Sequence, residues 1–307
     1  MLGYVVKRLF GAIPTIFVLI TLAFFLIRIA PGGPFDSERN LPPQIEANLN
    51  AKYHLDEPLY LQYSRYLLDI LSGDLGPSFQ YQDYTVNELI ASGFPISLRL
   101  GVLALILAII VGVTIGAVAA LKQNSLADHS LMTFAMTGIS IPNFVMAPLL
   151  ILIFAIYLRW LPAGGWSGGA AANLVLPVIT LALPQIAYIS RMTRGSMVEV
   201  LHSAYVRTAR AKGLSAPVIL FKHALKPALL PVVSYLGPTT AAVITGSVVI
   251  EQIFGIPGVG RYFVQGALNR DYTLVMGVVI FYGALIIVLN MLVDLLYAWL
   301  DPRVKLQ

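Results

Sequence analysis

The sequence contains no cysteine and only four histidines, and it lacks the common signatures of catalysis. Without cysteine the chain can form neither disulfides nor thiolate metal sites, and it offers no thiol nucleophile. The histidines show no His-Glu-x-x-His spacing for a metal ion, and no Gly-x-Ser-x-Gly elbow occurs. The phosphate-binding pattern Gly-x4-Gly-Lys-[Ser/Thr] is also missing, so the chain shows no means of hydrolysing ATP by itself.

Charged residues are scarce as well. They make up 11% of the 307 residues, whereas hydrophobic residues make up 58%. A soluble domain carries about a quarter charged residues. A bilayer explains the deficit, because apolar side chains can then face lipid as well as a protein core.

Six apolar segments are long enough to cross a membrane, which takes about 20 mostly apolar residues in a helix. They are roughly Leu9–Ala30, Leu98–Leu121, Ser130–Leu158, Leu174–Ser190, Ala228–Ile250 and Tyr272–Trp299. The first run is longer than a signal-peptide core and no Ala-x-Ala site follows it, so we expect it to be retained. The sequence therefore predicts an all-α integral membrane protein with six transmembrane helices.

Basic residues are distributed unequally between the two sides that six spans create. Twelve of the 20 lysines and arginines fall before the first span or after the second, fourth and sixth. The short connections opposite contribute only Arg159, Arg261 and Arg270. Because lysine and arginine accumulate in cytoplasmic loops, we expect both termini and the loop after the fourth span to be cytoplasmic.

This topology divides the chain into three regions. They are a tail with the first span (1–30), an external subdomain (31–95) and a core with the other five spans (96–307), which includes a cytoplasmic loop (191–227). The external region carries nine acids against Arg39, Lys52 and Arg65. It can be a cap over helix ends, or a contact for an external binding protein or for substrate.

The spans contain two further patterns. Small residues recur every four positions in the second span, as Ala104, Ala108, Gly112, Gly116 and Ala120. This ridge favours close helix packing over pore lining. Polar residues in the fourth and fifth spans can either join helices or line a route for a polar solute, and the candidates for the route are Gln185, Ser234, Thr239, Thr240 and Thr245. Ionisable residues within the spans are few, chiefly Arg28 and Asp294, which argues against a proton-coupled carrier.

The loop 191–227 holds seven of the 20 basic residues and one acid, Glu199. Ser203 can cap a short helix that ends at Lys212 with Gly213 at C′, and Ser215 can cap a second helix with Pro217 in its first turn. Such a pair also occurs in DNA-binding proteins, but tethering between two spans argues against nucleic acid. We predict a docking surface for a cytoplasmic protein, formed by Arg207, Thr208, Ala209, Arg210, Ala211, Lys212, Gly213 and Leu214.

At this loop the sequence resembles the permease subunits of binding-protein-dependent ABC importers. Their loop reads Glu-Ala-Ala-x3-Gly-x9-Ile-x-Leu-Pro, and alignment on Gly213 retains only Ala209 and Leu225 besides the glycine. The peptide-permease branch is much more similar, since it resembles Arg207–Gly213 and the His223-Ala224-Leu225 that follows. Further matches to this branch, most like the B-type permease of an oligopeptide importer, are Arg28–Gly32, Gly73–Ser78, Glu251–Gly260 and Asn269–Tyr272.

The resemblance implies a subunit without enzymatic activity in a bacterial inner membrane complex. Its partners would be a second similar permease, two ABC ATPase subunits that use ATP and Mg²⁺, and an external solute-binding protein. The chain itself would bind no cofactor, and peptides would be the substrate, although dipeptide, nickel and glutathione permeases share much of the pattern. An ion- or proton-driven carrier and a membrane enzyme or scaffold are the competing interpretations.

Overall fold

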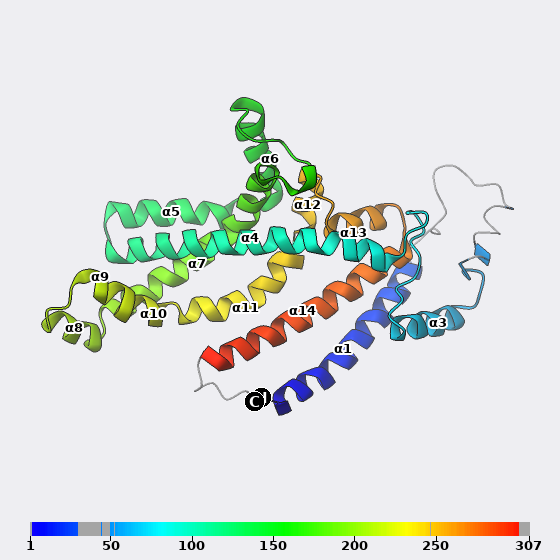
Figure 1. The fold of residues 1–307 in the computed structure, drawn as a ribbon, viewed down its shortest axis with the longest axis horizontal. Coiled ribbons are helices and arrows are strands. Elements are labelled where there is room, and N and C mark those ends of the chain that lie inside the picture. Colours follow the sequence, from blue (N-terminus) through cyan, green and yellow to red (C-terminus); the bar gives the residue numbers. More distant parts are fainter. Residues whose placement is uncertain (1, 30–43, 45–49, 52, 246, 301–307) are drawn as a thin grey trace. The chain divides into compact units, whose positions relative to one another are not determined.

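A computed structural model describes residues 2–29, 44, 50–51, 53–245 and 247–300 of the chain, and helices dominate them (Figure 1). Among these residues the only extended pairing is an isolated bridge between Pro77 and Thr85. The prediction of an all-helical chain is therefore confirmed. The helices are α1 (Leu2–Ile29), α3 (Leu59–Leu71), α4 (Val86–Leu121), α5 (Leu126–Ser140), α6 (Asn143–Leu150), α7 (Ala171–Leu201), α8 (Ala204–Ala211), α9 (Ala216–Val218), α10 (Leu225–Ala228), α11 (Leu230–Thr245), α12 (Val248–Phe254), α13 (Val259–Leu268) and α14 (Tyr272–Leu300), with π-helical segments at Ile151–Tyr157 and Ile219–Ala224 and a 3-10 turn at Ser167–Gly169.

The chain forms two compact units, whose boundaries fall within α4, between α12 and α13, and within α14. The first unit comprises Met1–Ile96 and Pro257–Val288, and the second comprises Ser97–Ile256 and Leu289–Gln307. The division expected from the sequence, 1–30, 31–95 and 96–307, follows membrane sides rather than compactness, and it stays a prediction. Some residues used in the sequence analysis lie outside the described residues, namely Arg39, Lys52, Arg303 and Lys305. The side chain of Asp294 is not described either.

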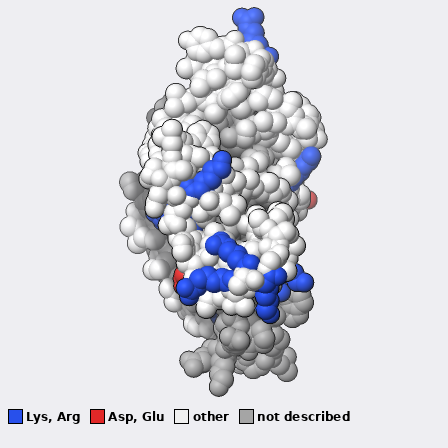
Figure 2. Space-filling view, turned by 90° about the vertical axis from the view of Figure 1, so that its left-hand side faces the viewer, with Lys and Arg blue, Asp and Glu red and all other residues white. Residues whose placement is uncertain are grey.

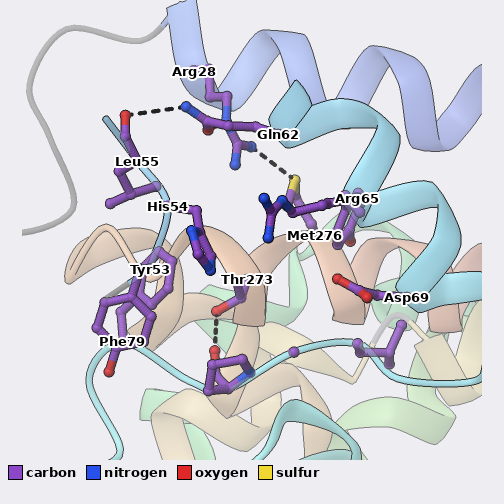
Figure 3. Close-up of a pocket in the computed structure, with 14 residues that line it drawn as sticks. Arg28, Tyr53, His54, Leu55, Gln62, Arg65, Asp69, Phe79, Thr273 and Met276 are labelled. Atoms are coloured by element: carbon purple, nitrogen blue, oxygen red, sulfur yellow. Dashed lines mark hydrogen bonds between the residues drawn. The ribbon is translucent and has the colours of Figure 1, made fainter. Parts of the chain in front are cut away.

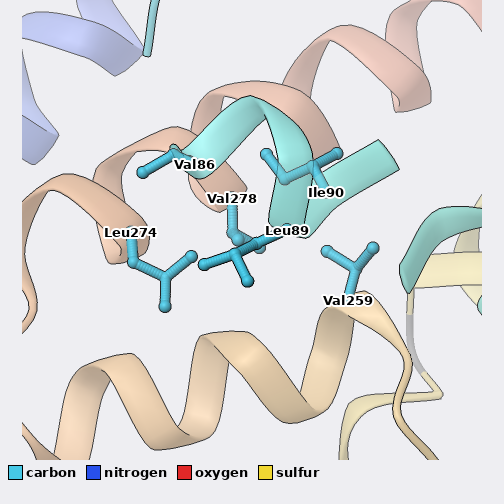
Figure 4. Close-up of a cluster of buried hydrophobic side chains, with 6 residues drawn as sticks. All are labelled: Val86, Leu89, Ile90, Val259, Leu274 and Val278. Atoms are coloured by element: carbon cyan, nitrogen blue, oxygen red, sulfur yellow. The ribbon is translucent and has the colours of Figure 1, made fainter. Parts of the chain in front are cut away.

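Two apolar clusters hold the first unit together. In one, Ile20 and Phe24 of α1 pack with Tyr66 of α3 and with Met276 and Ile280 of α14. The other brings three residues of α4 together with α13 and α14, and its members are Val86, Leu89, Ile90, Val259, Leu274 and Val278 (Figure 4). Full burial of one such side chain contributes about 1.5–3 kcal/mol, so these clusters fix α3 and the segment before α4 against α1 and α14.

Asp271 organises the connection to α14. Its side chain is fully buried, and its Oδ2 accepts hydrogen bonds from the Ser78 hydroxyl at 2.5 Å and from the backbone N–H groups of Phe79 and Gln80 at 3.2 Å. Its Oδ1 accepts from the backbone N–H of Leu274 at 3.1 Å, within the first turn of α14. One carboxylate thus joins the motif Gly73–Ser78 to the motif Asn269–Tyr272.

The small-residue ridge of α4 packs against α7. Ala104, Ala108 and Ala120 are buried, and a Cβ placed on Gly112 would lie 2.9 Å from the Cβ of Ile189. A Cβ on Gly116 would lie 2.5 Å from the carbonyl oxygen of Ser190. Since lipid provides no hydrophobic drive for helix association, close backbone approach is the usual basis of such contacts. The packing interpretation of this ridge is confirmed.

Three of the expected spans differ in detail from the structure. Ser130–Leu158 is not one straight helix: α5 ends at Ser140, Ile141 is extended, and the chain bends by 107° before continuing through α6. The residue before a proline is driven out of the α conformation, and Pro142 has this effect on Ile141. A bend of 47° between α10 and α11 lies at the start of the fifth expected span, Ala228–Ile250, and α11 ends at Thr245.

The second expected span begins earlier than predicted, at Val86 instead of Leu98. Residues 86–95, assigned to the external loop from the sequence, are therefore helical. In all, four helices in the described part of the chain are long and apolar enough to cross a membrane, and up to six if each bent pair counts as one span.

Candidate functional site

The predicted docking loop folds as a pair of short helices after α7. Helix α8 begins after Ser203 and ends at Ala211, and Gly213 follows with a φ of +76°. This left-handed conformation favours glycine, which has no Cβ to clash with the following carbonyl. Ser215 precedes α9, and Pro217 lies in its first turn. The boundaries of the pair therefore agree with the sequence analysis, but neither predicted cap forms a side-chain hydrogen bond to its helix. The hydroxyl of Ser203 donates instead to the carbonyl of Val200 at 2.6 Å.

A small apolar cluster holds the two helices against each other. Val206 and Ala209 of α8 are buried against Ile219, and Val200 of α7 packs on the same cluster. Ala209, one of the predicted docking residues, therefore faces inward and supports the helix. The remaining members of the predicted set are exposed: Arg207, Thr208, Arg210, Ala211, Lys212, Gly213 and Leu214.

Exposed cations gather on this helix pair (Figure 2). They are Arg207, Arg210, Lys212, Lys222 and Lys226. No salt bridge joins any of them to a residue in the described part of the chain. An uncompensated basic surface attracts acidic partners and accelerates their association. We call these five residues the basic patch.

Arg194 belongs to the same basic stretch of sequence but has a different role. Its guanidinium forms two hydrogen bonds with the carboxylate of Asp128, at 2.6 and 2.7 Å. Asp128 is 1% exposed, and its Oδ2 also accepts from the backbone N–H of Asn124. Sequence reasoning missed this pair, although Ser125-x-x-Asp128 has the spacing of a capping box and marks a helix start.

The base of the helix pair is anchored to two long helices. Ala224 and Ala228, which lie between α9 and α11, are fully buried with Met197 of α7 and Ala120 of α4. Three of these four side chains are alanines, so the backbones approach closely. The base of the helix pair is therefore packed against both α4 and α7.

The predicted route residues occupy different environments. Gln185 of α7 accepts a hydrogen bond from the Tyr235 hydroxyl of α11 at 2.7 Å, and the ring centroids of Tyr188 and Tyr235 are 5.7 Å apart. The hydroxyls of Ser234, Thr240 and Thr245 each donate to the carbonyl four residues earlier in α11. Thr239 is 6% exposed, and Ser234 is exposed. The structure thus brings Gln185 into contact with α11 and distributes the others along that helix; their role in a route stays a prediction.

No group of three or more histidine, aspartate and glutamate side chains that could hold a metal ion occurs among the described residues. The site consists of a basic, exposed helix pair whose base packs against α4 and α7. Such an arrangement suits binding and mechanical transmission.

Comparisons with solved structures agree with the fold. The chain superposes on the inward-facing MetNI methionine ABC transporter with a TM-score of 0.56 at 16% identity, covering 69% of this chain and 96% of the other. An amino acid ABC transporter crystallised with histidines gives a TM-score of 0.52 at 17% identity, covering 71% and 95%. At these identities the likeness concerns the fold alone.

Sequence relatives are much nearer. The chain is 57% identical over 305 residues to the oligopeptide transport system permease protein OppB of Haemophilus influenzae, covering 99% of this chain and 100% of the relative. The OppB protein of Escherichia coli is also 57% identical over the same lengths. The dipeptide transport system permease protein DppB of Bacillus subtilis is 47% identical over 306 residues, covering 100% of this chain and 99% of the relative.

Two family models together match almost the whole chain. The model described as the binding-protein-dependent transport system inner membrane component matches residues 112–306, and the model of its N-terminal region matches residues 1–101. The apolar helices agree with a multi-pass protein of the inner membrane. The chain belongs to the family of inner membrane components of binding-protein-dependent transport systems, and within that family it is a permease of the oligopeptide and dipeptide branch.

Proposed function

We propose that this chain is the permease subunit of an ATP-driven importer that moves oligopeptides across the bacterial inner membrane. The observation that carries the proposal is the basic patch on a helix pair that is fastened to α4 and α7. The relatives named for oligopeptide transport are 57% identical, compared with 47% for a relative named for dipeptide transport. This difference favours oligopeptides over dipeptides as the substrate.

In the proposed transport cycle, ATP binding by partner subunits is coupled to a change between two conformations of the permease. Two ABC ATPase subunits would bind ATP and Mg²⁺, and they would dock on the loop around Gly213. ATP need only bind one arrangement of these subunits better than the other to shift the equilibrium between an inward-open and an outward-open permease. The buried alanines at the base of the helix pair support this proposal, because a well-packed contact transmits a displacement without absorbing it.

The proposed topology has six spans, in which each bent helix pair counts as one, and both termini are cytoplasmic. The region 31–95, whose last residues from Val86 onward form the start of α4, would then lie outside, where an external solute-binding protein delivers the peptide. A second, homologous permease would complete the route. Gln185, Ser234, Thr239, Thr240 and Thr245 are the candidates for residues that line it.

The substrate is tested by uptake into proteoliposomes that contain the complete complex purified from a host expressing all subunits. A radiolabelled pentapeptide is supplied with the binding protein, and ATP is enclosed on the side of the ATPases. We expect ATP-dependent uptake that unlabelled pentapeptides suppress and that nickel and glutathione leave unchanged. Suppression by nickel or glutathione alone would contradict the oligopeptide assignment, and uptake driven by an ion gradient without ATP would contradict the ABC mechanism.

A further inference from the structure

The first unit contains a pocket that the proposed transport mechanism does not use. Figure 3 shows it between the end of α1, the helix α3, the segment before α4 and the first turns of α14. Its volume is about 190 Å³, enough for a small polar group. Its lining includes Arg28, Gln62, Tyr66, Thr273 and Met276.

Arg28 is held in this pocket by neutral groups. Its Nε donates to the Oε1 of Gln62 at 3.0 Å, and its guanidinium carbon lies 3.7 Å from the ring centroid of Phe24. Gln62 is itself fixed, because its amide donates to the carbonyls of Leu55 and Glu57. Among the described residues, the Nη1 atom of Arg28 donates to the sulfur of Met276, a weak acceptor at 3.8 Å. Within the described ranges no carboxylate forms an ion pair with Arg28.

Tyr66 supplies a second donor with no acceptor. The residue is 8% exposed, and its hydroxyl has no hydrogen-bond partner among the described residues. A buried hydroxyl without a partner is destabilising, and natural structures seldom leave one in that state. Burial raises the pKa of this hydroxyl above its usual range, although the positive charge of Arg28 opposes the effect, so Tyr66 remains a donor at neutral pH.

Of the other charged side chains that line the pocket, Arg65 pairs with Glu57 and Asp69 is exposed. Glu57 Oε1 accepts from Arg65 at 2.9 Å and lies 3.2 Å from the imidazole of His54, whereas the buried Oε2 of Glu57 has no hydrogen-bond partner among the described residues. Asp69 lies one turn further along α3 and is exposed, where solvent screens its charge. Among the described residues that line the pocket, Arg28 is therefore a cation with no carboxylate partner, and its guanidinium is suited to bind an oxyanion.

The position of Arg28 indicates where that oxyanion comes from. Arg28 lies in the last turn of the apolar stretch Phe10–Ile29, whose 20 residues match the thickness of the hydrocarbon layer. It therefore lies at the depth of lipid headgroups. Leu22, Leu26 and Ile29 follow one face of α1 and are 56%, 66% and 76% exposed, so acyl chains can lie along the same helix.

We propose that this pocket binds the phosphate of a phospholipid headgroup, which accepts hydrogen bonds from the guanidinium of Arg28 and from the hydroxyl of Tyr66. The phosphate carries a single negative charge and neutralises Arg28. The bound lipid then ties the end of α1 to α3 and α14. This inference goes beyond peptide transport, and it does not depend on which substrate is carried.

The test measures phosphatidylglycerol bound to the full-length chain, purified in mild detergent with whatever subunits accompany it, by native mass spectrometry. Arg28→Gln removes the charge, and Tyr66→Phe removes only the hydroxyl while it keeps the ring that packs on Phe24. Arg65→Gln is the matched control, because Arg65 also lines the pocket but already pairs with Glu57. Size-exclusion chromatography verifies that each variant is folded.

We expect Arg28→Gln to weaken binding of phosphatidylglycerol by about tenfold or more, and Tyr66→Phe by about threefold to tenfold, as the loss of one charge-assisted hydrogen bond predicts. Arg65→Gln should retain the affinity of the unsubstituted chain. Equal lipid retention in all variants would overturn the site. Inorganic phosphate or a free tripeptide that binds in an Arg28-dependent manner, with no such binding of phosphatidylglycerol, would assign the pocket to a soluble anion and overturn the lipid proposal.

Discussion

Asp128 and Arg194 form a bidentate ion pair that joins the first turn of α5 to α7, through the two oxygens of a carboxylate that is 1% exposed. The pair lies in the stretch of α7 that precedes the docking helices. The helices α5 and α7 also approach closely at Gly138 and Leu183, so the ion pair adds a polar interaction to an existing packing contact.

We expect Asp128→Asn to destabilise the protein by about 2 kcal/mol, because a hydrogen bond to a charged group contributes about 1.5–3 kcal/mol and Arg194 would lose its counter-charge. Denaturant unfolding in detergent measures the change. Arg210→Gln is the control, and as an exposed residue it should change stability by no more than about 0.5 kcal/mol. Adding Arg194→Gln to Asp128→Asn should cause little further loss. If the double variant loses as much stability as the sum of the losses in Asp128→Asn and Arg194→Gln alone, the two residues are not coupled.

Gly116 offers a second test of packing, between α4 and α7. A Cβ at this position would lie 2.5 Å from the carbonyl oxygen of Ser190, so Gly116→Ala forces the helices apart and should destabilise the protein by about 1–3 kcal/mol. Gly195→Ala is a matched control, because Gly195 is also helical and no heavy atom lies within 4 Å of its ideal Cβ. The control should be neutral or stabilising by up to about 1 kcal/mol through helix propensity. Equal effects of the two substitutions on thermal unfolding would refute the close contact.

The features predicted well from the sequence are those with local physical causes. Gly213 requires a left-handed conformation, Pro217 suits a first helical turn, and both mark the docking pair without knowledge of the rest of the chain. Similarly, the spacing of Gly112 and Gly116 places both on one face of a helix, which made close packing foreseeable. Their partners on α7 were not foreseeable, because contacts between distant segments leave no periodic pattern.

The start of α4 was predicted too late because hydropathy, not capping, defined the span. Thr85 and Glu88 form a capping box, in which the Glu88 carboxylate accepts from the N–H of Thr85 at 2.8 Å and the Thr85 hydroxyl accepts from the N–H of Glu88 at 3.3 Å. The helix therefore begins before its apolar run.

The bend at Pro142 was not predicted, because the apolar run continues through it. In α7, by contrast, the helix continues through Pro177 and Pro184. The same residue type gives different results because neighbouring helices decide whether the freed backbone groups are satisfied.

The lack of cysteine makes the topology directly measurable, since a single introduced cysteine is the only thiol in the chain. Arg210 and Arg159 are both exposed, and six spans place them on opposite sides of the membrane. We expect a membrane-impermeant maleimide to label Arg159→Cys in intact spheroplasts, and Arg210→Cys only in inside-out vesicles. Detergent-solubilised protein, in which both cysteines should react, controls for reactivity. Labelling of Arg210→Cys in spheroplasts would overturn the cytoplasmic assignment of the basic patch.

Gly213 provides the sharpest test of coupling. Its φ of +76° is strained for any residue with a β-branched side chain, whereas no heavy atom lies within 4 Å of its ideal Cβ. Gly213→Val therefore distorts the docking turn without a clash inside the chain. We expect the complex to assemble but to hydrolyse ATP with peptide uptake reduced by about tenfold or more, since small misplacements at a mechanical contact are strongly amplified. Gly213→Asn, which tolerates the left-handed conformation, should retain most of the uptake.

Gly168 separates the effect of the docking turn from that of backbone strain. It has a φ of +65° and also has no heavy atom within 4 Å of its ideal Cβ, but it lies in the 3-10 turn before α7, away from the basic patch in sequence. Gly168→Val introduces the same kind of strain, so it should lower the thermal stability as much as Gly213→Val does and leave the ratio of peptide uptake to ATP hydrolysis unchanged. If both variants lower this ratio equally, the loss reflects general destabilisation, and the loop around Gly213 is not the point at which ATP hydrolysis is coupled to transport.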